Sequence, residues 1–276
     1  MSVLVLGAGG TVGSALSVRE GCIGAPRSEV DITDLGAFEQ VLDRVVPHAV
    51  VNCAAMANVD RCDREPGVAW AVNAEAPGRL AAACAGRGIR FVHLSTDYVL
   101  TGPDRPGVRL GEDQLPDPRS GYARSKRAGE LAALAQGAVV LRVQWVYGLG
   151  GTSFFARALD MLREGQTVRL VTDQVGTPTE VGWLAGRVHE AALGGPTGLF
   201  HLAPEGEASA LEWICAGAEA LDIPTGGVVP VRRADLPGAF RPARSCLDSR
   251  RFQAAWPSAW PDWSACLRDA LRRRSS

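Results

Sequence analysis

The first thirteen residues restrict the fold of this 276-residue chain more than any other stretch. Residues 2–6, Ser-Val-Leu-Val-Leu, are almost entirely apolar, which is typical of a strand buried on both faces of a parallel sheet. Gly7, Gly10 and Gly13 follow at three-residue spacing, and a helix is predicted over residues 12 to about 19. This order brings backbone N–H groups and a helix N-terminus against a pyrophosphate. The stretch therefore predicts a dinucleotide site, and the alternative is a plain tight turn.

Strands and helices alternate along the first half of the chain. Further strands are predicted over residues 21–25, 47–52, 90–95 and 138–143, and helices over residues 35–44, 69–87 and the stretch around Tyr122. This alternation predicts an α/β fold with a doubly wound parallel sheet.

The alternation loosens in the second half of the chain. Helices are predicted over residues 153–164, up to about 192, 209–221 and from about 262, with strands over 168–171 and 198–202. We interpret these elements as a smaller C-terminal lobe that closes over the strand ends. The expected domains are residues 1–148, which bind the dinucleotide, and residues 149–276, which form mainly the substrate lobe with some segments returning to the first domain.

Two strand ends are expected to meet the dinucleotide. No acidic residue ends the strand over residues 21–25, where many such folds hold the ribose 2′-hydroxyl with a carboxylate. Arg27 follows instead and could meet a 2′-phosphate, which favours NADPH, with NADH possible and a plain surface arginine as the alternative. Residues 53–56, Cys-Ala-Ala-Met, end the strand over residues 47–52, and small side chains there let a flat ring approach.

Lys126 is the only lysine in the sequence, beside 28 arginines. Tyr122 stands four residues earlier on the same predicted helix, so the two side chains share a face. A nearby ammonium stabilises a phenolate and lowers the pKa of a tyrosine, which would let Tyr122 exchange a proton when a hydride reduces a carbonyl group. Thr96, at the tip of the strand over residues 90–95, could hold the carbonyl oxygen. The alternative is an accidental pair on a helix surface.

Composition excludes several classes of function. The formal net charge is −1, which argues against broad binding of nucleic acid or of a membrane surface. No apolar run approaches the length that spans a membrane. The seven cysteines form no C-x-x-C pair and do not cluster with the four histidines, so no metal site is predicted. An odd number of cysteines and no recognisable signal peptide predict reduced thiols in a cytoplasmic protein.

Several sequence blocks together carry a family resemblance. They are Gly7-x-x-Gly10-x-x-Gly13, Asp31-Ile-Thr-Asp34, Leu94-Ser-Thr-Asp-Tyr-Val99, Tyr122-Ala-Arg-Ser-Lys126, Leu141-Arg-x-x-Trp-Val-Tyr147 and Asp173-Gln-x-Gly-x-Pro-Thr179. With them, nearly the whole chain resembles the dTDP-4-dehydrorhamnose reductase family of the extended short-chain dehydrogenase/reductase superfamily. The blocks beginning at Leu94 and at Asp173 are specific to this branch, whereas Tyr-x-x-x-Lys is common to the superfamily.

The resemblance implies a Rossmann-type fold and a reaction. NADPH or NADH would reduce the C4 ketone of dTDP-4-dehydro-6-deoxy-L-mannose to dTDP-L-rhamnose, in a monomer or homodimer. Tyr122 would donate the proton, and Lys126 would bind the nicotinamide ribose. Thr96 and Asp97 would touch the sugar, and Trp145 would pack on it. The residues implied to line the cofactor are Gly7, Gly10, Thr11, Val12, Asp31, Ile32, Ala54, Ala55 and Met56.

Some positions depart from the family pattern, and two other functions stay open. Gln144, Met56 and Arg244 stand where a small hydroxyl residue, a small or polar residue and an asparagine are common, which bears on the sugar and the cofactor preference. One alternative is a related 4-ketoreductase for another nucleotide deoxysugar in natural-product biosynthesis. The other is a regulatory subunit that binds a nucleotide without catalysis, against which the intact Thr96, Tyr122 and Lys126 argue.

Overall fold

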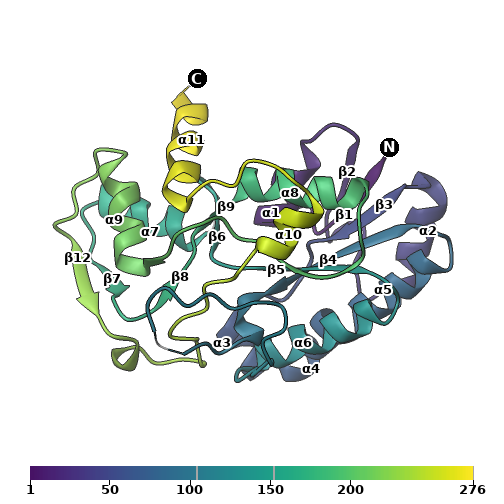
Figure 1. Ribbon diagram of the computed structural model, residues 1–276, viewed down its shortest axis with the longest axis horizontal. Helices are drawn as coiled ribbons and strands as arrows, with labels where there is room; N and C mark the ends of the chain where they lie inside the picture. Colours follow the sequence, from purple (N-terminus) through teal and green to yellow (C-terminus); the bar gives the residue numbers. More distant parts are fainter. Residues whose placement is uncertain (104, 152, 276) are drawn as a thin grey trace.

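A six-stranded parallel sheet forms the centre of the molecule (Figure 1). The computed structural model describes residues 1–103, 105–151 and 153–275. The strands run in the order β10, β5, β4, β3, β1 and β2, and every neighbouring pair is parallel. Their bounds are β1 Val3–Leu6, β2 Cys22–Ala25, β3 Ala49–Asn52, β4 Arg90–Thr96, β5 Val139–Val143 and β10 Gly198–His201. The predicted doubly wound parallel sheet is confirmed.

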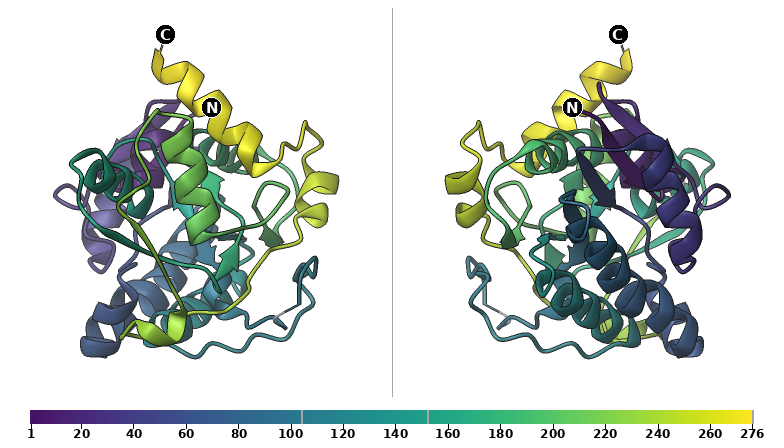
Figure 2. Two further views of the ribbon diagram at one scale, coloured as in Figure 1. Left: turned by 90° about the vertical axis from the view of Figure 1, so that its left-hand side faces the viewer. Right: turned by 90° about the vertical axis from the view of Figure 1, so that its right-hand side faces the viewer.

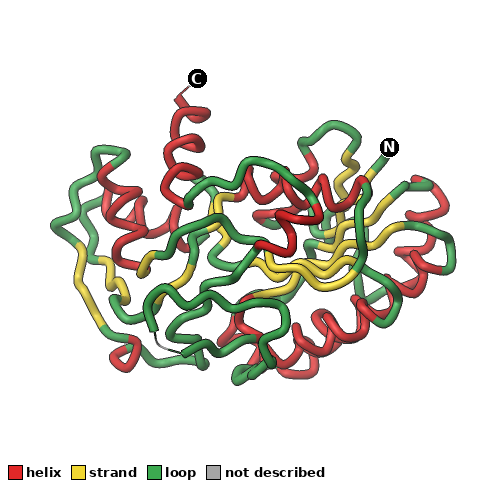
Figure 3. Tube along the Cα trace, viewed as in Figure 1, coloured by secondary structure: helices red, strands yellow, loops and turns green. Residues whose placement is uncertain are grey.

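Helices cover both faces of this sheet (Figures 1 and 3). One face carries α1 (Thr11–Ser17) and α8 (Val181–Leu193), and the other carries α2 (Leu35–Val45), α5 (Ala76–Ala85) and α6 (Gly121–Leu134). Successive side chains of a strand point to opposite faces. Val3 and Val5 therefore pack toward α1 and α8, while Leu4 and Leu6 pack toward α2 and α5. Burial on both faces explains the continuous apolar run of β1.

The alanine-rich stretch predicted as one helix over residues 69–87 consists of three pieces. They are α4 (Pro66–Trp70), a π-helical turn (Ala71–Glu75) and α5. The prediction of one continuous α-helix is wrong, because a π turn keeps the chain helical and leaves no clear mark on the hydrophobic pattern. A short helix, α3 (Val59–Arg64), precedes these three pieces.

A smaller lobe lies beyond the carboxyl ends of the strands and faces the viewer in the left view of Figure 2. It contains α7 (Phe154–Arg163), α9 (Ala210–Glu219) and the parallel pair β7 (Val168–Val171) and β12 (Val228–Val231). Its own core includes Tyr147, Phe155 and Trp213. Sequence analysis missed β12, since Pro230 interrupts its apolar run and proline is disfavoured inside sheets. Between β7 and α9 in the sequence, α8 and β10 return to the central sheet.

The remaining elements join the sheet to the lobe. They are β6 (Val146–Tyr147), β8 (Val175–Gly176), β9 (Thr179–Glu180), β11 (Ala208–Ser209), α10 (Arg250–Ala255), α11 (Trp263–Ser275) and two 3-10 helices, Asp97–Val99 and Arg233–Asp235. No helix within the described ranges has the length and apolar character needed to cross a membrane. Over the same residues, no group of three or more His, Cys, Asp or Glu side chains could hold a metal ion.

Candidate active site

Two glycines of the turn after β1, Gly7 and Gly13, have no room for a side chain. Gly7 has a φ of +75°, and a Cβ placed on it would lie 2.7 Å from the backbone nitrogen of Ala54. A Cβ on Gly13 would lie 2.2 Å from the Gly7 carbonyl oxygen. Gly10 is the N-cap of α1, and no side chain caps this helix, so its first amides can bind an anion. The turn therefore fits the pyrophosphate of a dinucleotide.

A cavity of about 240 Å³ adjoins this turn. It lies at the ends of β1, β2 and β3, where the strand order reverses on either side of β1, which is the usual ligand position in an open α/β sheet. Several predicted cofactor residues line it: Gly7, Arg27, Asp31, Ile32, Ala54, Ala55 and Met56. Gly10, Thr11 and Val12 lie beside it at the start of α1. The structure thus gathers these predicted positions at one edge of the sheet.

Arg27 lies at the rim of this cavity of about 240 Å³. Its side chain is 83% exposed and forms an ion pair of 3.0 Å with Asp31. Hydrogen bonds from the Thr33 backbone and hydroxyl hold the pKa of Asp31 below its ordinary value. An exposed guanidinium with a carboxylate on one side keeps other N–H donors free for a phosphate.

Asn73 holds the cavity wall in place, and sequence analysis missed it. Its side chain lies in the π-helical turn and is 1% exposed. Its Oδ1 accepts the Met56 N–H at 2.9 Å, and its Nδ2 donates to the Met56 carbonyl at 3.0 Å and to the Ser125 hydroxyl at 3.2 Å. A buried asparagine within an alanine-rich stretch was the available signal, since a buried amide needs specific partners.

Tyr122 lies in the first turn of α6, which Ser120 caps by accepting the Ala123 N–H. Its hydroxyl lies near the Thr96 side chain, which acts to lower the pKa of Tyr122. Burial raises the pKa of Tyr122 above its ordinary value. The net pKa of Tyr122 is therefore not lowered as its spacing from Lys126 predicted, because burial disfavours the phenolate more strongly. The raised pKa keeps the proton on Tyr122 at neutral pH.

Lys126 is almost fully buried beneath Tyr122. It is 2% exposed, and its Nζ donates to the Leu94 carbonyl at 2.7 Å and lies 3.3 Å from His93 Nε2. Burial lowers the pKa of Lys126 to about 8. The lysine can therefore change its protonation state close to neutral pH.

A buried carboxyl group adjoins Thr96. Asp97 is 2% exposed. Its Oδ1 accepts a hydrogen bond from the Thr96 hydroxyl at 3.1 Å, and its Oδ2 accepts one from the Ser245 hydroxyl. Burial raises the pKa of Asp97 to about 7. Ser245 stands 148 residues further along the chain, so only the tertiary structure brings it here.

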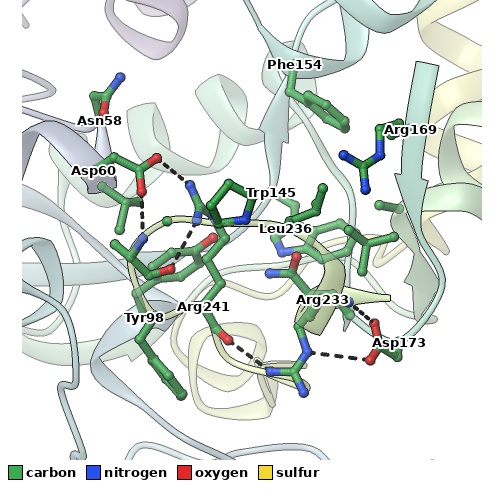
Figure 4. A pocket seen from close by; sticks show the side chains of 18 of the residues that line it. Asn58, Asp60, Tyr98, Trp145, Phe154, Arg169, Asp173, Arg233, Leu236 and Arg241 are labelled. Carbon is green, nitrogen blue, oxygen red and sulfur yellow. Dashed lines mark hydrogen bonds and ion pairs between the residues drawn. The ribbon is translucent and has the colours of Figure 1, made fainter. Parts of the chain in front are cut away.

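A larger cavity of about 930 Å³ separates the sheet edge from the lobe (Figure 4). Aromatic rings line it: Tyr98, Trp145, Phe154, Trp213 and Phe240. It is also lined by four arginines and two aspartates: Arg157, Arg169, Arg233, Arg241, Asp60 and Asp173. Arg241 pairs with Asp60 at 2.8 Å, and Arg233 lies beside Asp173, as the dashed lines in Figure 4 show. The lining carries an excess of two positive charges, which suits a doubly charged anion.

Two features of the cavity lining are typical of ligand sites. Trp145 has a φ of +43°, and its ring packs where a Cβ on Gly176 would lie 2.6 Å away. Such strain in a bulky residue is uncommon outside functional sites. The Nε1 of Trp213 and the Nε of Arg233 are buried donors without a hydrogen-bond partner. Buried donors normally find a partner.

Tyr122 is not among the residues that line the two cavities, but it lies close to their junction. Residues 57 and 58 line both of them. The Tyr122 ring contacts Tyr98, from the larger cavity, and packs against the cluster that contains Met56, from the smaller one. A proton donor close to this junction can serve a reaction between a ligand in one cavity and a ligand in the other.

The sheet, the glycine turn and the Thr96–Tyr122–Lys126 group define a class, the nicotinamide-dependent oxidoreductases of the short-chain dehydrogenase/reductase type. The family model described as RmlD substrate binding domain matches residues 1–276. The chain belongs to this family, which is the dTDP-4-dehydrorhamnose reductase family.

Individual relatives agree with this assignment. A dTDP-4-dehydrorhamnose reductase of Mycolicibacterium smegmatis is 37% identical over 281 residues, which cover 98% of this chain and 84% of that protein. A dTDP-4-keto-6-deoxy-D-glucose reductase of Streptomyces niveus is 32% identical over 277 residues, covering 97% and 96%. The crystal structure of dTDP-4-dehydrorhamnose reductase from Bacillus anthracis in complex with NADP is 27% identical, with a TM-score of 0.92, and covers 99% of this chain and 100% of that one.

Proposed function

We propose that the chain uses NADPH to reduce the C4 ketone of a dTDP-4-dehydro-6-deoxyhexose, converting dTDP-4-dehydrorhamnose into dTDP-L-rhamnose. The observation that carries the proposal is that Tyr122 contacts Tyr98, in the wall of a basic, aromatic cavity, and packs against the cluster that contains Met56, in the wall of a crevice for a dinucleotide. Residues 1–148 supply most of the crevice, and residues 149–276 supply much of the cavity wall.

The larger cavity suits a nucleoside diphosphate sugar. The excess of two positive charges matches the two charges of a diphosphate diester, and arginine binds phosphate oxygens in pairs. The Nε1 of Trp213 and the Nε of Arg233, which have no hydrogen-bond partner within the chain, can add hydrogen bonds for the same ligand. Aromatic rings such as Trp145 and Phe154 offer flat faces for the base and the sugar.

The chain's own residues handle the proton and the orientation of the ketone. Bound NADPH supplies the hydride. Thr96 and Asp97 lie beside the Tyr122 hydroxyl and bind the ketone end of the sugar. Tyr122 keeps its proton at neutral pH and gives it to the oxygen that becomes negative, because an alkoxide is a stronger base than a phenolate. Lys126, one helical turn away, holds the cofactor side of the site and tunes this transfer.

We assign NADPH as the cofactor because of Arg27 and the glycine turn. The Arg27 guanidinium stands at the rim of the smaller cavity, where the 2′-phosphate of NADPH would lie. Gly7, Gly10, Thr11 and Val12 face the pyrophosphate. Ala54, Ala55 and Met56 form the wall along which the cofactor reaches Tyr122.

A second candidate is a 4-ketoreductase for a different dTDP-deoxysugar. The Streptomyces niveus relative, which carries such a name, supports it, and Gln144 and Arg244 near the sugar end distinguish this chain from the family pattern. A regulatory subunit without catalysis is disfavoured by the intact Tyr122 and Lys126, because binding alone requires no proton donor.

A purified-protein assay tests these alternatives. We expect NADPH oxidation to depend on dTDP-4-dehydrorhamnose and to be at least 10-fold slower with dTDP-4-keto-6-deoxy-D-glucose. The opposite preference would establish the second candidate. Binding of the sugar nucleotide with no oxidation of NADPH or NADH would overturn both reductase assignments.

The assembly and the compartment are also proposals. All the proposed site residues come from one chain, so we propose that a monomer or homodimer is active. The seven cysteines are free thiols, and we propose that the protein works in the cytoplasm, where thiols stay reduced.

A further inference from the structure

A buried chain of three polar side chains lies beneath the active site. Asn52 ends β3, His93 lies on β4 and Lys126 lies on α6. Asn52 and His93 are fully buried, and Lys126 is 2% exposed. Asn52 and His93 are partners in the register of β3 and β4, so their side chains lie on the same face of the sheet. The proposed roles of Tyr122 and Lys126 do not explain why two polar side chains, Asn52 and His93, are fully buried next to Lys126.

The orientation of Asn52 determines which ring nitrogen of His93 carries a proton. Asn52 Oδ1 accepts the Ala54 N–H at 3.0 Å, so its Nδ2 must be the atom that lies 3.2 Å from His93 Nδ1. An amide nitrogen only donates, and Nδ1 must therefore accept. Burial holds the pKa of His93 well below its ordinary value, and the ring is neutral with a single proton. That proton must be on Nε2.

The Nε2–H of His93 points toward Lys126. Its distance to Nζ is 3.3 Å, and Nζ donates on its other side to the Leu94 carbonyl at 2.7 Å. An ammonium has donors only, so an N–H group facing it offers no hydrogen bond and is repulsive. A neutral amine has a lone pair, which can accept the same N–H. The imidazole therefore interacts favourably with only one of the two protonation states of Lys126.

We propose that His93, oriented by Asn52, is a positioning residue that favours the neutral amine of Lys126 over its ammonium form. The inference rests on the proposed function for its catalytic role. When the Lys126 ammonium releases a proton, an N–H bond breaks and a lone pair is left on Nζ. The lone pair left on Nζ accepts the His93 Nε2–H. A proton from water then restores the ammonium.

None of the other ionisable groups described near Lys126 favours its neutral amine. Glu130 lies one turn further along α6 and favours the ammonium, but Arg142, Arg127 and Ser95 bind its carboxylate. Two thiols also face the lysine, those of Cys53 after β3 and Cys62 on α3. Burial raises the pKa of Cys53 to about 12 and raises that of Cys62, so both thiols are neutral.

The composition of the chain permits a direct test. Because Lys126 is the only lysine, protein labelled with lysine carrying ¹³C at Cε gives one lysine signal, and its pH titration reports Lys126 alone. Nitrogen-15 labelling of the histidine rings reports the His93 tautomer without any substitution. We expect Nε2 protonated, Nδ1 unprotonated and a titration midpoint near 8, well below the ordinary 10.5 of a lysine.

Two substitutions should move this midpoint in the same direction. In His93→Gln the amide oxygen can turn to the ammonium, and we expect the midpoint to rise by about one pH unit or more. Asn52 does not contact Lys126, but Asn52→Leu removes the hydrogen bond to His93 Nδ1. The His93 ring can then turn a lone pair toward Lys126 Nζ, so the midpoint should rise in this variant as well. His201→Gln is the matched control, since this buried histidine contacts Arg142 and not Lys126. It should leave the midpoint unchanged.

The outcomes separate this inference from the proposed function. A proton on Nδ1 of His93 in the wild-type protein, or an unchanged Lys126 midpoint in His93→Gln, would overturn the inference. Neither measurement needs a substrate. If the His93 tautomer and the Lys126 midpoint are as expected while no sugar nucleotide is reduced, the proposed function fails. The role of His93 in setting the protonation of Lys126 then still stands. In an active enzyme, the alkaline limb of the kcat profile should move upward in His93→Gln together with the midpoint.

Discussion

The Tyr122 ring meets the Tyr98 ring edge to face, with the ring centroids 5.8 Å apart. Tyr98 lines the larger cavity, and the Tyr122 hydroxyl reaches Thr96 behind it. This contact fixes the direction of the Tyr122 side chain, because an edge-to-face pair resists rotation of either ring. The Tyr122 side chain is therefore held in one orientation before any ligand binds.

Removing the Tyr122 hydroxyl should abolish most of the turnover. We expect Tyr122→Phe to lower kcat by about 10²- to 10⁴-fold, because the alkoxide loses its positioned proton donor. NADPH binding, measured by fluorescence titration, should change little. Tyr147→Phe is the matched control, since the Tyr147 hydroxyl is buried in the lobe without a hydrogen-bond partner. Turnover of Tyr122→Phe at the wild-type rate would contradict the role of Tyr122.

Lys126→Arg should lose activity although it keeps the positive charge. The Leu94 carbonyl at 2.7 Å and His93 at 3.3 Å leave no room for the larger planar guanidinium. We expect kcat to fall by about 100-fold or more, with a circular dichroism spectrum like that of the wild type. Arg124→Lys, an exposed position on the same helix, should retain activity. A fully active Lys126→Arg enzyme would show that any cation suffices at this position.

The glycine turn allows a comparison of two alanine substitutions. A Cβ on Gly13 would lie 2.2 Å from the Gly7 carbonyl oxygen, whereas a Cβ on Gly9 would meet nothing within 4 Å. We expect Gly13→Ala to lower the free energy of unfolding by about 1–3 kcal/mol and to weaken NADPH binding, because the turn must open. Gly9→Ala should stay within about 0.5 kcal/mol of the wild type. Thermal unfolding with and without NADPH measures both effects, and equal behaviour of the two variants would contradict the tight-packing explanation.

Arg27→Ala should change the cofactor preference. Loss of one charge-assisted hydrogen bond to the 2′-phosphate should raise the KM for NADPH by about 10-fold or more and leave the KM for NADH nearly unchanged. Steady-state kinetics with both cofactors checks this, with Arg44→Ala as an exposed control outside the cavity. Equal losses with NADPH and NADH would show that Arg27 does not read the phosphate.

The buried carboxyl group of Asp97 should make stability depend on pH. Its pKa is raised from the ordinary 3.8 to about 7, so the unfolded chain loses this proton at a lower pH than the folded chain does. Stability should therefore fall as the pH rises from about 4 to 7, by roughly 4 kcal/mol in total. Below about pH 4 this loss of stability from ionising Asp97 is absent, and above about pH 7 it is complete.

Asp97→Asn removes this titration. Urea unfolding at pH 5 and pH 8 should show the variant gaining stability relative to the wild type as the pH rises. Asp113→Asn, at an exposed carboxylate, should follow the wild type. A constant difference between Asp97→Asn and the wild type at all pH values would mean that Asp97 ionises normally in the folded protein.

Local sequence patterns were sufficient to predict most of the fold. The apolar run of β1, the glycines at positions 7, 10 and 13 and the alternation of strands with helices depend on neighbouring residues, so the parallel sheet could be predicted from them. The π-helical turn at residues 71–75 and β12 could not, because the first leaves no clear periodicity and the second contains a proline and is paired only through the lobe.

The amino-acid sequence by itself determined the chemistry of the candidate site. A lone lysine, a tyrosine on the same helix face and a hydroxyl at a strand tip are all visible in the order of residues. The tertiary structure decided the environment of these groups. Burial raised the pKa of Tyr122, whereas its spacing from Lys126 predicted a lowered pKa. The fold also placed Asn73, Ser245 and His93 against the site. The physical reason is that desolvation and hydrogen-bond partners depend on what the folded chain packs around a group, and those neighbours lie far away in the sequence.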